Sequence, residues 1–155
     1  MKLITRNTDY AMRALCYLAQ RREFSASATE LVRELRIPRP FLRKLLQKLG
    51  GEGILRSTKG QGGGFTLARS PETVRLTDLI RIFQGGIQLN ECIFKKRVCP
   101  NRGTCPLKRE IDAIERSALQ QLSKVSIASL IKKKRPQDRL DNKIQRASFK
   151  KRRSL

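Results

Sequence analysis

Residues 27–68 read SATELVRELRIPRPFLRKLLQKLGGEGILRSTKGQGGGFTLA. Ser27 and Glu30 have the spacing of a capping box, in which each side chain bonds the other residue's backbone N–H, so a short helix should begin here. Arg36 and Ile37 then make a tight turn before a second helix. The apolar positions of this second helix are Phe41, Leu42, Leu45, Leu46 and Leu49. Its opposite face carries Arg39, Arg43, Lys44, Gln47 and Lys48. Two short helices joined by a tight turn, the second basic on one face, predict a helix-turn-helix.

A β-hairpin is predicted directly after the two helices. Residues 54–57 and 65–68 are strand-like, and a glycine-rich turn that begins at Lys59 separates them. The turn is not followed by the lysine and serine or threonine that open the helix of a P-loop, which argues against a nucleotide site. A hairpin after a helix-turn-helix is instead the layout of a winged helix. In that layout the glycine-rich tip approaches the DNA backbone, and Arg56, Lys59 and Gln61 supply hydrogen-bond donors.

Amphipathic helices are predicted on both sides of the winged-helix pattern. One spans about residues 7–22, and a short one spans residues 76–83, with Thr77 as its cap. A long one runs from residue 107 to about residue 125. Its apolar stripe consists of Ile111, Ile114, Ala118, Leu119 and Leu122. We expect the stripe to pack against the same helix of a second copy, because helix-turn-helix proteins read two half-sites as symmetric dimers. A helix folded back on its own domain is the alternative.

The chain is expected to be mainly α-helical and to divide into four parts. Residues 1–86 form a winged helix-turn-helix DNA-binding domain with a small β-hairpin wing, and residues 87–106 form a cysteine-containing loop. Residues 107–131 form a long C-terminal dimerisation helix. Residues 132–155 contain eleven Lys or Arg and two Asp residues. This tail is predicted to be flexible and to add sequence-independent attraction to phosphates, and a purely solubilising role is the alternative.

The composition favours a polyanionic partner and argues against catalysis. The 155 residues include 35 Lys or Arg against 13 Asp or Glu, which gives a formal net charge of +22, and there is no His. This charge favours double-stranded DNA as a partner. Without His the commonest general base is missing, so we expect neither an enzyme nor a small-molecule substrate. The sequence lacks an apolar run that could cross a bilayer and a secretory signal at its start, so a cytoplasmic location without a membrane partner is expected.

Three cysteines that lie in one segment of the chain point to a metal or redox centre. Cys92, Cys99 and Cys105 are separated by six and then five residues, and no CxxC knuckle of the kind typical of structural zinc occurs. Three widely spaced thiolates suit an iron–sulfur cluster, which takes soft ligands and tolerates an unusual fourth one. A thiol or disulfide switch and a zinc site are the alternatives. Cys16 lies within the first predicted helix and is expected to be a buried small hydrophobe.

One combination of motifs is specific. It consists of TDYA at residues 8–11, IPRPFLRKL at residues 37–45, LRS at residues 55–57, KGQGGGFTLARSP at residues 59–71 and the three cysteines. By this combination the chain resembles the Rrf2 family of bacterial winged-helix transcription regulators. Iron–sulfur cluster regulators and nitric-oxide-sensitive repressors are members of that family. The resemblance covers roughly residues 1–130 and does not extend to the basic tail.

The resemblance implies a homodimer with a cluster near the junction of the dimerisation helix and the DNA-binding domain. It places DNA contacts on the second helix and the wing, at Arg39, Pro40, Arg43, Lys44, Lys59 and Gln61. It also implies one non-cysteine ligand. The position three residues after Cys105, a His in some members, is Lys108 here, and a protonated lysine is a poor ligand. In nitric-oxide-sensitive repressors of the family this ligand can be an Asp in the first helix of the partner subunit, and Asp9 stands at the matching position. The resemblance therefore implies Asp9 as the candidate fourth ligand, and an ordinary first-turn helix acid is the alternative.

The expected function is a DNA-binding transcriptional repressor whose operator affinity depends on an iron–sulfur cluster. The cluster would sense nitric oxide, redox state or iron–sulfur supply. A 4Fe–4S cluster is favoured over 2Fe–2S because a carboxylate is a hard, labile ligand and leaves one corner open to attack. A thiol-switch regulator and a cluster-free or zinc-containing DNA-binding regulator are the alternatives. An electron-transfer protein fits less well, because electron transfer needs neither a helix-turn-helix nor a wing.

Overall fold

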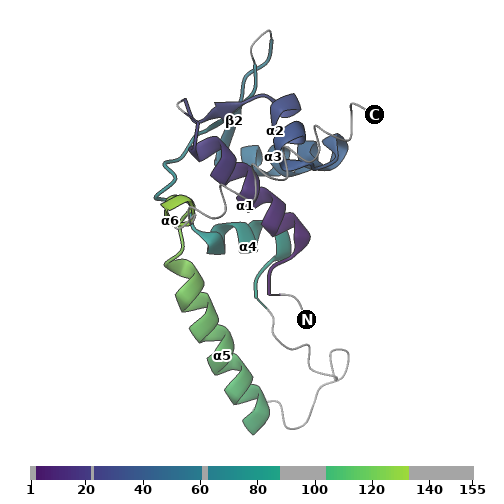
Figure 1. Ribbon diagram of the computed structural model, residues 1–155. Coiled ribbons are helices and arrows are strands. Elements are labelled where there is room, and N and C mark those ends of the chain that lie inside the picture. The colour runs from purple at the N-terminus through teal and green to yellow at the C-terminus, as the bar shows by residue number, and fades with distance from the viewer. Residues whose placement is uncertain (1–2, 22, 61–62, 88–103, 133–155) are drawn as a thin grey trace, which may run out of the picture.

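The computed structural model of the protein describes residues 3–21, 23–60, 63–87 and 104–132. These residues form six α-helices and one three-stranded antiparallel sheet (Figure 1). The helices are α1 (Arg6–Ala19), α2 (Ala28–Leu35), α3 (Arg39–Gly51), α4 (Leu76–Gln84), α5 (Pro106–Ser123) and α6 (Ile127–Lys132). The strands are β1 (Ser25–Ala26), β2 (Leu55–Ser57) and β3 (Phe65–Leu67). The mainly helical winged-helix fold expected from the sequence is confirmed. The basic tail beyond Lys132 lies outside the described residues.

Helices α2 and α3 form the helix-turn-helix. The Ser27 hydroxyl accepts a hydrogen bond from the Glu30 N–H at 3.1 Å, which is one half of the predicted capping box. The Glu30 carboxylate accepts a hydrogen bond from the Tyr17 hydroxyl at 2.7 Å and pairs with Arg21, so it joins α2 to the end of α1. Arg36 ends α2 in the left-handed conformation, with φ of 55°. This sharp reversal places α3 across α2.

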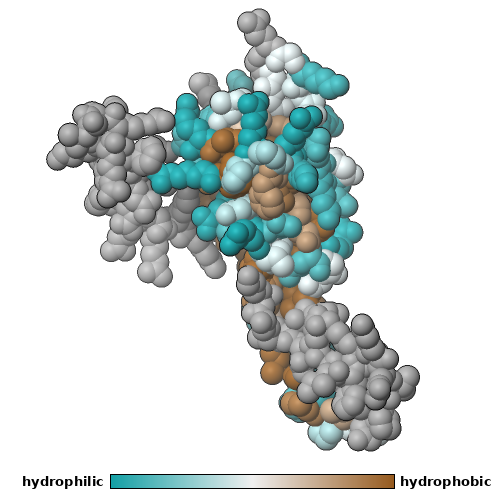
Figure 2. Space-filling view, turned by 90° about the vertical axis from the view of Figure 1, so that its right-hand side faces the viewer, coloured by the Kyte–Doolittle hydropathy of each residue, from teal (hydrophilic) through white to brown (hydrophobic). Residues whose placement is uncertain are grey.

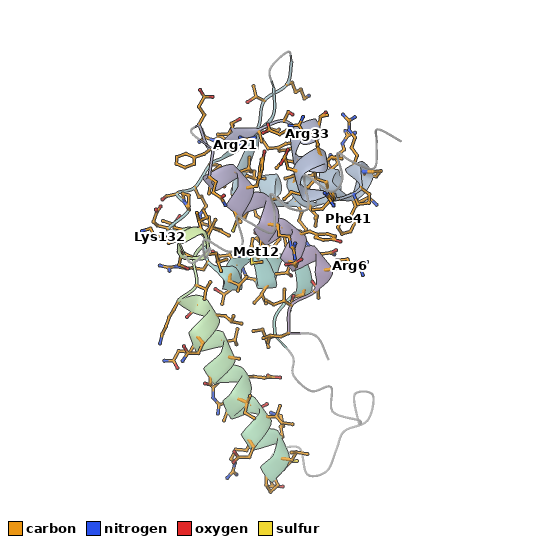
Figure 3. All side chains as sticks on the ribbon, in the orientation of Figure 1. Arg6, Met12, Arg21, Arg33, Phe41 and Lys132 are labelled. Atoms are coloured by element: carbon orange, nitrogen blue, oxygen red, sulfur yellow. The ribbon has the colours of Figure 1, made fainter. Side chains whose placement is uncertain are left out.

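The apolar faces of α1, α3 and α4 meet in one core. This core contains Ala11, Ala14, Leu15, Leu18, Leu42, Leu46, Leu49 and Leu79. A second, smaller cluster of Leu76, Ile80 and Ile87 lies beside it. Met12 on α1 packs against both clusters (Figure 3). Because the apolar side of α3 is buried in this way, its basic side is turned outward.

The sheet has the strand order β1-β3-β2. Strands β2 and β3 form the predicted hairpin, with Leu55 opposite Leu67 and Ser57 opposite Phe65. Strand β1 was not predicted, because two residues are too few to show an alternating pattern. It pairs with the other edge of β3, with Ala26 opposite Phe65. The wing is therefore attached to the segment between α1 and α2 as well as to α3.

The helix predicted from residue 107 to about residue 125 corresponds to α5, but the dimerisation segment assigned to residues 107–131 is not one continuous helix. Helix α5 ends at Ser123, and a separate helix, α6, turns back into the winged-helix domain. Ser126 and Ser129 cap α6 reciprocally, since each hydroxyl accepts from the other residue's backbone N–H at 3.0–3.1 Å. The Ile127 N–H donates to the Val74 carbonyl at 3.0 Å, and the Ile127 side chain is fully buried. Residues 126–132 therefore belong to the core of the domain.

Two predicted helix ends also differ from the structure. Helix α1 ends at Ala19, three residues before the predicted end. Helix α4 is not capped by Thr77. Its N-cap residue is Arg75, whose backbone N–H donates to the Asp78 carboxylate at 3.0 Å. None of the helices in the described ranges is both long and apolar enough to cross a membrane.

Helix α5 projects from the body of the protein (Figure 1). Its C-terminal end is anchored there, since Leu122, together with Val125 just beyond the helix, packs against the second apolar cluster. None of the eighteen residues of α5 is buried. The exposed fractions are 65% for Leu107, 58% for Ile114 and 38% for Leu119. Figure 2 shows hydrophobic residues running down this projecting part of the molecule.

Candidate nucleic-acid interface and metal centre

The exposed face of α3 presents the predicted DNA-contacting residues together. Arg39, Pro40, Arg43 and Lys44 are all exposed, and the four-residue spacing from 39 to 43 and from 40 to 44 puts them on one side of the helix. Pro38 is the N-cap residue and makes no side-chain cap bond. Arg39, Arg43 and Lys44 make no ion pair with another residue in the described ranges. Their charges are therefore available to an anionic partner.

The wing presents a second set of donors. Arg56 on β2 and Lys59 in the turn are exposed, whereas Gln61 lies outside the described residues. The turn is narrow: a Cβ atom on Gly63 would lie 2.3 Å from the Thr58 carbonyl oxygen, which only glycine avoids. Glycine at this position lets the two sides of the turn lie close together, which favours a close approach of the backbone to a phosphate.

The hydrogen bonds at the base of the wing fix its position relative to α3. The Ile54 N–H donates to the Leu49 carbonyl at 3.0 Å, and the Ala68 N–H donates to the Ile54 carbonyl at 2.9 Å. Because Leu49 lies in the last turns of α3, these bonds connect the helix end to both strands of the hairpin. The structure therefore holds the basic residues of the wing in a fixed position relative to those of α3.

An acidic side chain lies just after the wing. The Ser70 hydroxyl donates to the Glu72 carboxylate, and this hydrogen bond is the largest cause of a lowered pKa for Glu72. A backbone hydrogen bond and the charge of Lys132 act in the same direction. Glu72 therefore stays ionised at neutral pH.

The structure describes only part of the predicted metal centre. Cys105 is half-buried and is the N-cap residue of α5, at the end that lies farthest from the body (Figure 1). Cys92 and Cys99 lie outside the described residues. Lys108 pairs with Asp112 one turn along α5. Within the described ranges no three Cys, Asp or Glu side chains come together as a metal site.

Asp9, the predicted fourth ligand, lies in the first turn of α1. Its carboxylate is half-buried and accepts from the Arg13 guanidinium at 2.9 Å, an i,i+4 pair. A surface ion pair of this kind contributes only about 0–1 kcal/mol of stability, so the Asp9 carboxylate is still available to bind a metal. Asp9 lies in the first turn of α1, whereas Cys105 is the N-cap residue at the start of α5. Cys16 is half-buried and packs against the main core, close to what the sequence predicted.

A polar junction at the start of α1 was not predicted from the sequence. Thr8 is fully buried, and its hydroxyl bonds the hydroxyl of Thr5 at 3.1 Å and the side chain of Gln84 at 2.8 Å. Gln84 is the last residue of α4. Thr8 and Gln84 lie 76 positions apart in the sequence, so no spacing rule within one helix could have connected them.

Comparison with known proteins points to one family. The Rrf2 family model, described as an iron-dependent transcriptional regulator, matches residues 4–133. The HTH-type transcriptional regulator NsrR of Bacillus subtilis strain 168 is 30% identical over 136 residues, which cover 86% of this chain and 92% of that protein. Two solved structures share the fold. CymR (YrzC), the global cysteine regulator of B. subtilis, has a TM-score of 0.71 at 22% identity and covers 85% of this chain and 98% of its own. IscR of T. potens has a TM-score of 0.67 at 22% identity and covers 85% of this chain and 87% of its own.

Proposed function

The chain belongs to the Rrf2 family of transcriptional regulators, and from this we propose that it is a dimeric repressor whose operator affinity depends on an iron–sulfur cluster. The observation that carries the proposal is the pairing of two features in one chain. One feature is an exposed basic face on α3 beside a glycine-tipped wing. The other is a three-cysteine motif at the start of a projecting apolar helix.

The DNA-binding part of the proposal assigns different tasks to the two basic sets. Arg43 and Lys44 lie one turn into α3, where side chains of a recognition helix reach base edges in the major groove. Arg39 at the helix start, and Arg56 and Lys59 on the wing, would contact phosphates, which position the protein without reading sequence. Pro40 starts the helix in the required conformation and offers no competing backbone donor.

The dimer is proposed from the exposed stripe of α5. Leu107, Ile111, Ile114, Ala118 and Leu122 share one side of this helix. Burying a leucine or isoleucine side chain that water now surrounds contributes about 1.5–3 kcal/mol, so a second copy of α5 is the natural cover. A symmetric pair would present two α3 helices to half-sites about 34–36 Å apart. The spacing of the two recognition helices then sets the operator affinity.

The donor set of the candidate centre fits an iron–sulfur cluster. Cys92, Cys99 and Cys105 of one protomer would hold it together with Asp9 of the partner subunit, and 4Fe–4S is favoured over 2Fe–2S. When bound, the cluster supplies iron that nitric oxide or an oxidant can attack, most easily at the carboxylate-held corner. Arg13 keeps the Asp9 carboxylate on the outer side of α1, where a second copy can reach it. The two protomers would thus be tied near α1, the helix on which α3 packs.

The test begins with protein purified without air. We expect bound iron and sulfide and a visible absorption band, and Cys99→Ser should abolish the band. Cys16→Ser is the matched control and should keep it, since Cys16 packs against the core. A coloured Cys99→Ser protein would contradict the ligand assignment.

The second measurement is DNA affinity with and without the cluster. Wild-type protein, reconstituted with iron and sulfide or stripped with a chelator, is titrated against an operator duplex, and the two affinities should differ. Equal affinities would remove the sensing role and leave a DNA-binding regulator. Iron-free protein whose affinity changes with a thiol oxidant would instead identify the thiol switch.

A further inference from the structure

Gln84 joins three separate parts of the chain through its side-chain amide. Its Oε1 accepts hydrogen bonds from the Thr5 backbone N–H at 3.1 Å and from the Thr8 hydroxyl at 2.8 Å. Its Nε2 donates to the carbonyl of Leu3 at 3.1 Å and to the carbonyl of Gly86 at 3.3 Å. A backbone N–H can only donate and a carbonyl can only accept, so these partners fix the orientation of the amide. Both donors of the amide, and two acceptor positions on its oxygen, are in use.

One side of this junction holds the chain where it leaves the DNA-binding domain. Helix α4 ends at Gly85 in the left-handed conformation, with φ of 78°, and Gly86 follows with φ of 156°. Two such glycines let the chain change direction with little strain. Ile87 is then buried in the second apolar cluster, and the next residues lead to Cys92 and Cys99. The hydrogen bond from the Gln84 side chain to the Gly86 carbonyl bridges this pair of glycines.

The other side of the junction reaches the recognition helix. Thr5 is the N-cap residue of α1, and Thr8 lies in its first turn. Half a turn further, the Tyr10 ring meets the Phe41 ring edge-on, with 5.6 Å between ring centroids and 82° between planes. Phe41, labelled in Figure 3, lies in the first turn of α3, and Pro40 and Arg43 belong to the same helix. A displacement of the start of α1 therefore acts directly on the start of α3.

We infer that Gln84 is a positioning residue that couples the cysteine-containing segment to the recognition helix. The inference rests on the proposed function, because it concerns how the iron state of the protein alters DNA binding. When the chain moves at Gly86, it either breaks the bond to Gln84 or pulls the amide with it. In the second case the bonds to Thr5 and Thr8 pass the movement to α1. Coupling of this kind is a free-energy difference between two sites, which a variant can remove without removing either site.

Gln84→Glu separates the two sides of the junction. A carboxylate still accepts from Thr5 and Thr8 but cannot donate to the carbonyls of Leu3 and Gly86. The matched control is Gln120→Glu, which makes the same change of charge at an exposed position of α5 opposite its apolar stripe.

The experiment measures affinity for a duplex that wild-type protein selects from a random pool. Each protein is titrated after reconstitution with iron and sulfide and again after chelation. For the wild type we expect the two affinities to differ by roughly 5- to 150-fold, the usual range of allosteric coupling. Gln84→Glu should bring this ratio close to one while its iron content stays near that of the wild type, and its melting temperature should fall because two donated hydrogen bonds are lost. Gln120→Glu should keep the wild-type ratio.

Hydrogen exchange supplies a readout that does not depend on DNA. Backbone amides of residues 39–44 should exchange at different rates in the iron-loaded and iron-free wild type, and at the same rate in the two forms of Gln84→Glu. A merely structural role would raise exchange equally in both forms. That result, or an unchanged affinity ratio in Gln84→Glu, would overturn the coupling role and leave the proposed function standing. A wild-type ratio of one would overturn both.

A second pair of variants keeps the test decisive if Gln84→Glu does not fold. Thr8→Val removes the hydroxyl that bonds Gln84, and Thr8→Ser retains it. Loss of the affinity ratio in Thr8→Val together with its retention in Thr8→Ser would support the coupling. Retention in both would overturn it.

Discussion

At the scale of single residues, one side of α3 packs in the core and the opposite side carries the cations available for DNA. Leu42 and Leu46 are buried in the main core, whereas Arg43 and Lys44 face outward without ion-pair partners among the described residues. An unpaired cation has no internal salt bridge to break before it contacts DNA. The same α3 surface can therefore be altered without disturbing the core.

Arg43→Ala and Lys44→Ala should each weaken binding to the selected duplex by about 1–3 kcal/mol, because each would lose a contact to a base edge. Titrations against the selected duplex and single-base variants of it give the change in preference. Arg33→Ala on the exposed side of α2 is the control, since Arg33 pairs with Glu34, and it should change affinity little. If Arg43→Ala weakens binding equally on every sequence, Arg43 contacts phosphate.

Lys59→Ala should weaken binding by a similar factor on all sequences, because a wing lysine would neutralise a phosphate. The measurement is the slope of log affinity against log salt concentration. This slope should become shallower by about one, the contribution of a single phosphate contact. An unchanged slope would place Lys59 away from the DNA backbone.

Sequence patterns located these exposed residues but not the junctions between helices. The alternation of apolar and basic positions on α3 was enough to predict which side would be buried. The bond between Glu30 and Tyr17 and the bonds of Gln84 join residues far apart in the chain, and periodicity within one helix carries no information about them. Positions such as Cys92, Cys99 and Gln61 stay predictions.

At the scale of elements, the adjacent amphipathic helices α5 and α6 differ in whether their apolar residues are buried. Helix α5 has an apolar stripe and leaves it exposed, while α6 buries Ile127 in the domain core. The apolar stripe predicted from the sequence ended at Leu122, and the dimerisation segment was nevertheless assigned up to residue 131. The reciprocal serine cap at Ser126 and Ser129 starts a new helix there, and this pair of serines is the local signal that was overlooked.

Ile114→Glu should weaken the dimer by at least about 2 kcal/mol, because it would place an unpaired carboxylate in the middle of the α5 stripe. Sedimentation over a range of concentrations measures the monomer–dimer equilibrium. Gln120→Glu, on the opposite face of α5, should leave it unchanged. An Ile114→Glu protein as dimeric as the wild type would show that another surface pairs the copies.

At the scale of the whole molecule, the DNA-binding domain is closed by residues from both ends of the described chain. Helix α1 packs against α6, and backbone bonds from Leu76 to Val125 and from Ala128 to Pro71 continue this contact. Helix α5 is thus anchored at its C-terminal end and carries Cys105 at its other end. Events at the cysteines and at the domain are therefore connected through both ends of α5 and through Gln84.

Ile127→Ala should lower the free energy of unfolding by about 2–5 kcal/mol, as expected for a cavity at a fully buried isoleucine. Urea denaturation of the metal-free protein measures the change. Leu3→Ala is the control at a position where the side chain is 40% exposed, and it should cost about 1 kcal/mol or less. Similar losses in the two variants would mean that α6 adds little to the core.

The return of α6 also determines when this protein can fold during its synthesis. Ile127 completes a core that otherwise comes from the first 87 residues, so that core stays open while the ribosome is still translating α5. A nascent chain cannot finish its DNA-binding module early, as an independent N-terminal domain would. Premature termination anywhere before residue 127 would therefore release a product without a closed hydrophobic interior, which exposes it to proteolysis rather than leaving a truncated competitor for the operator.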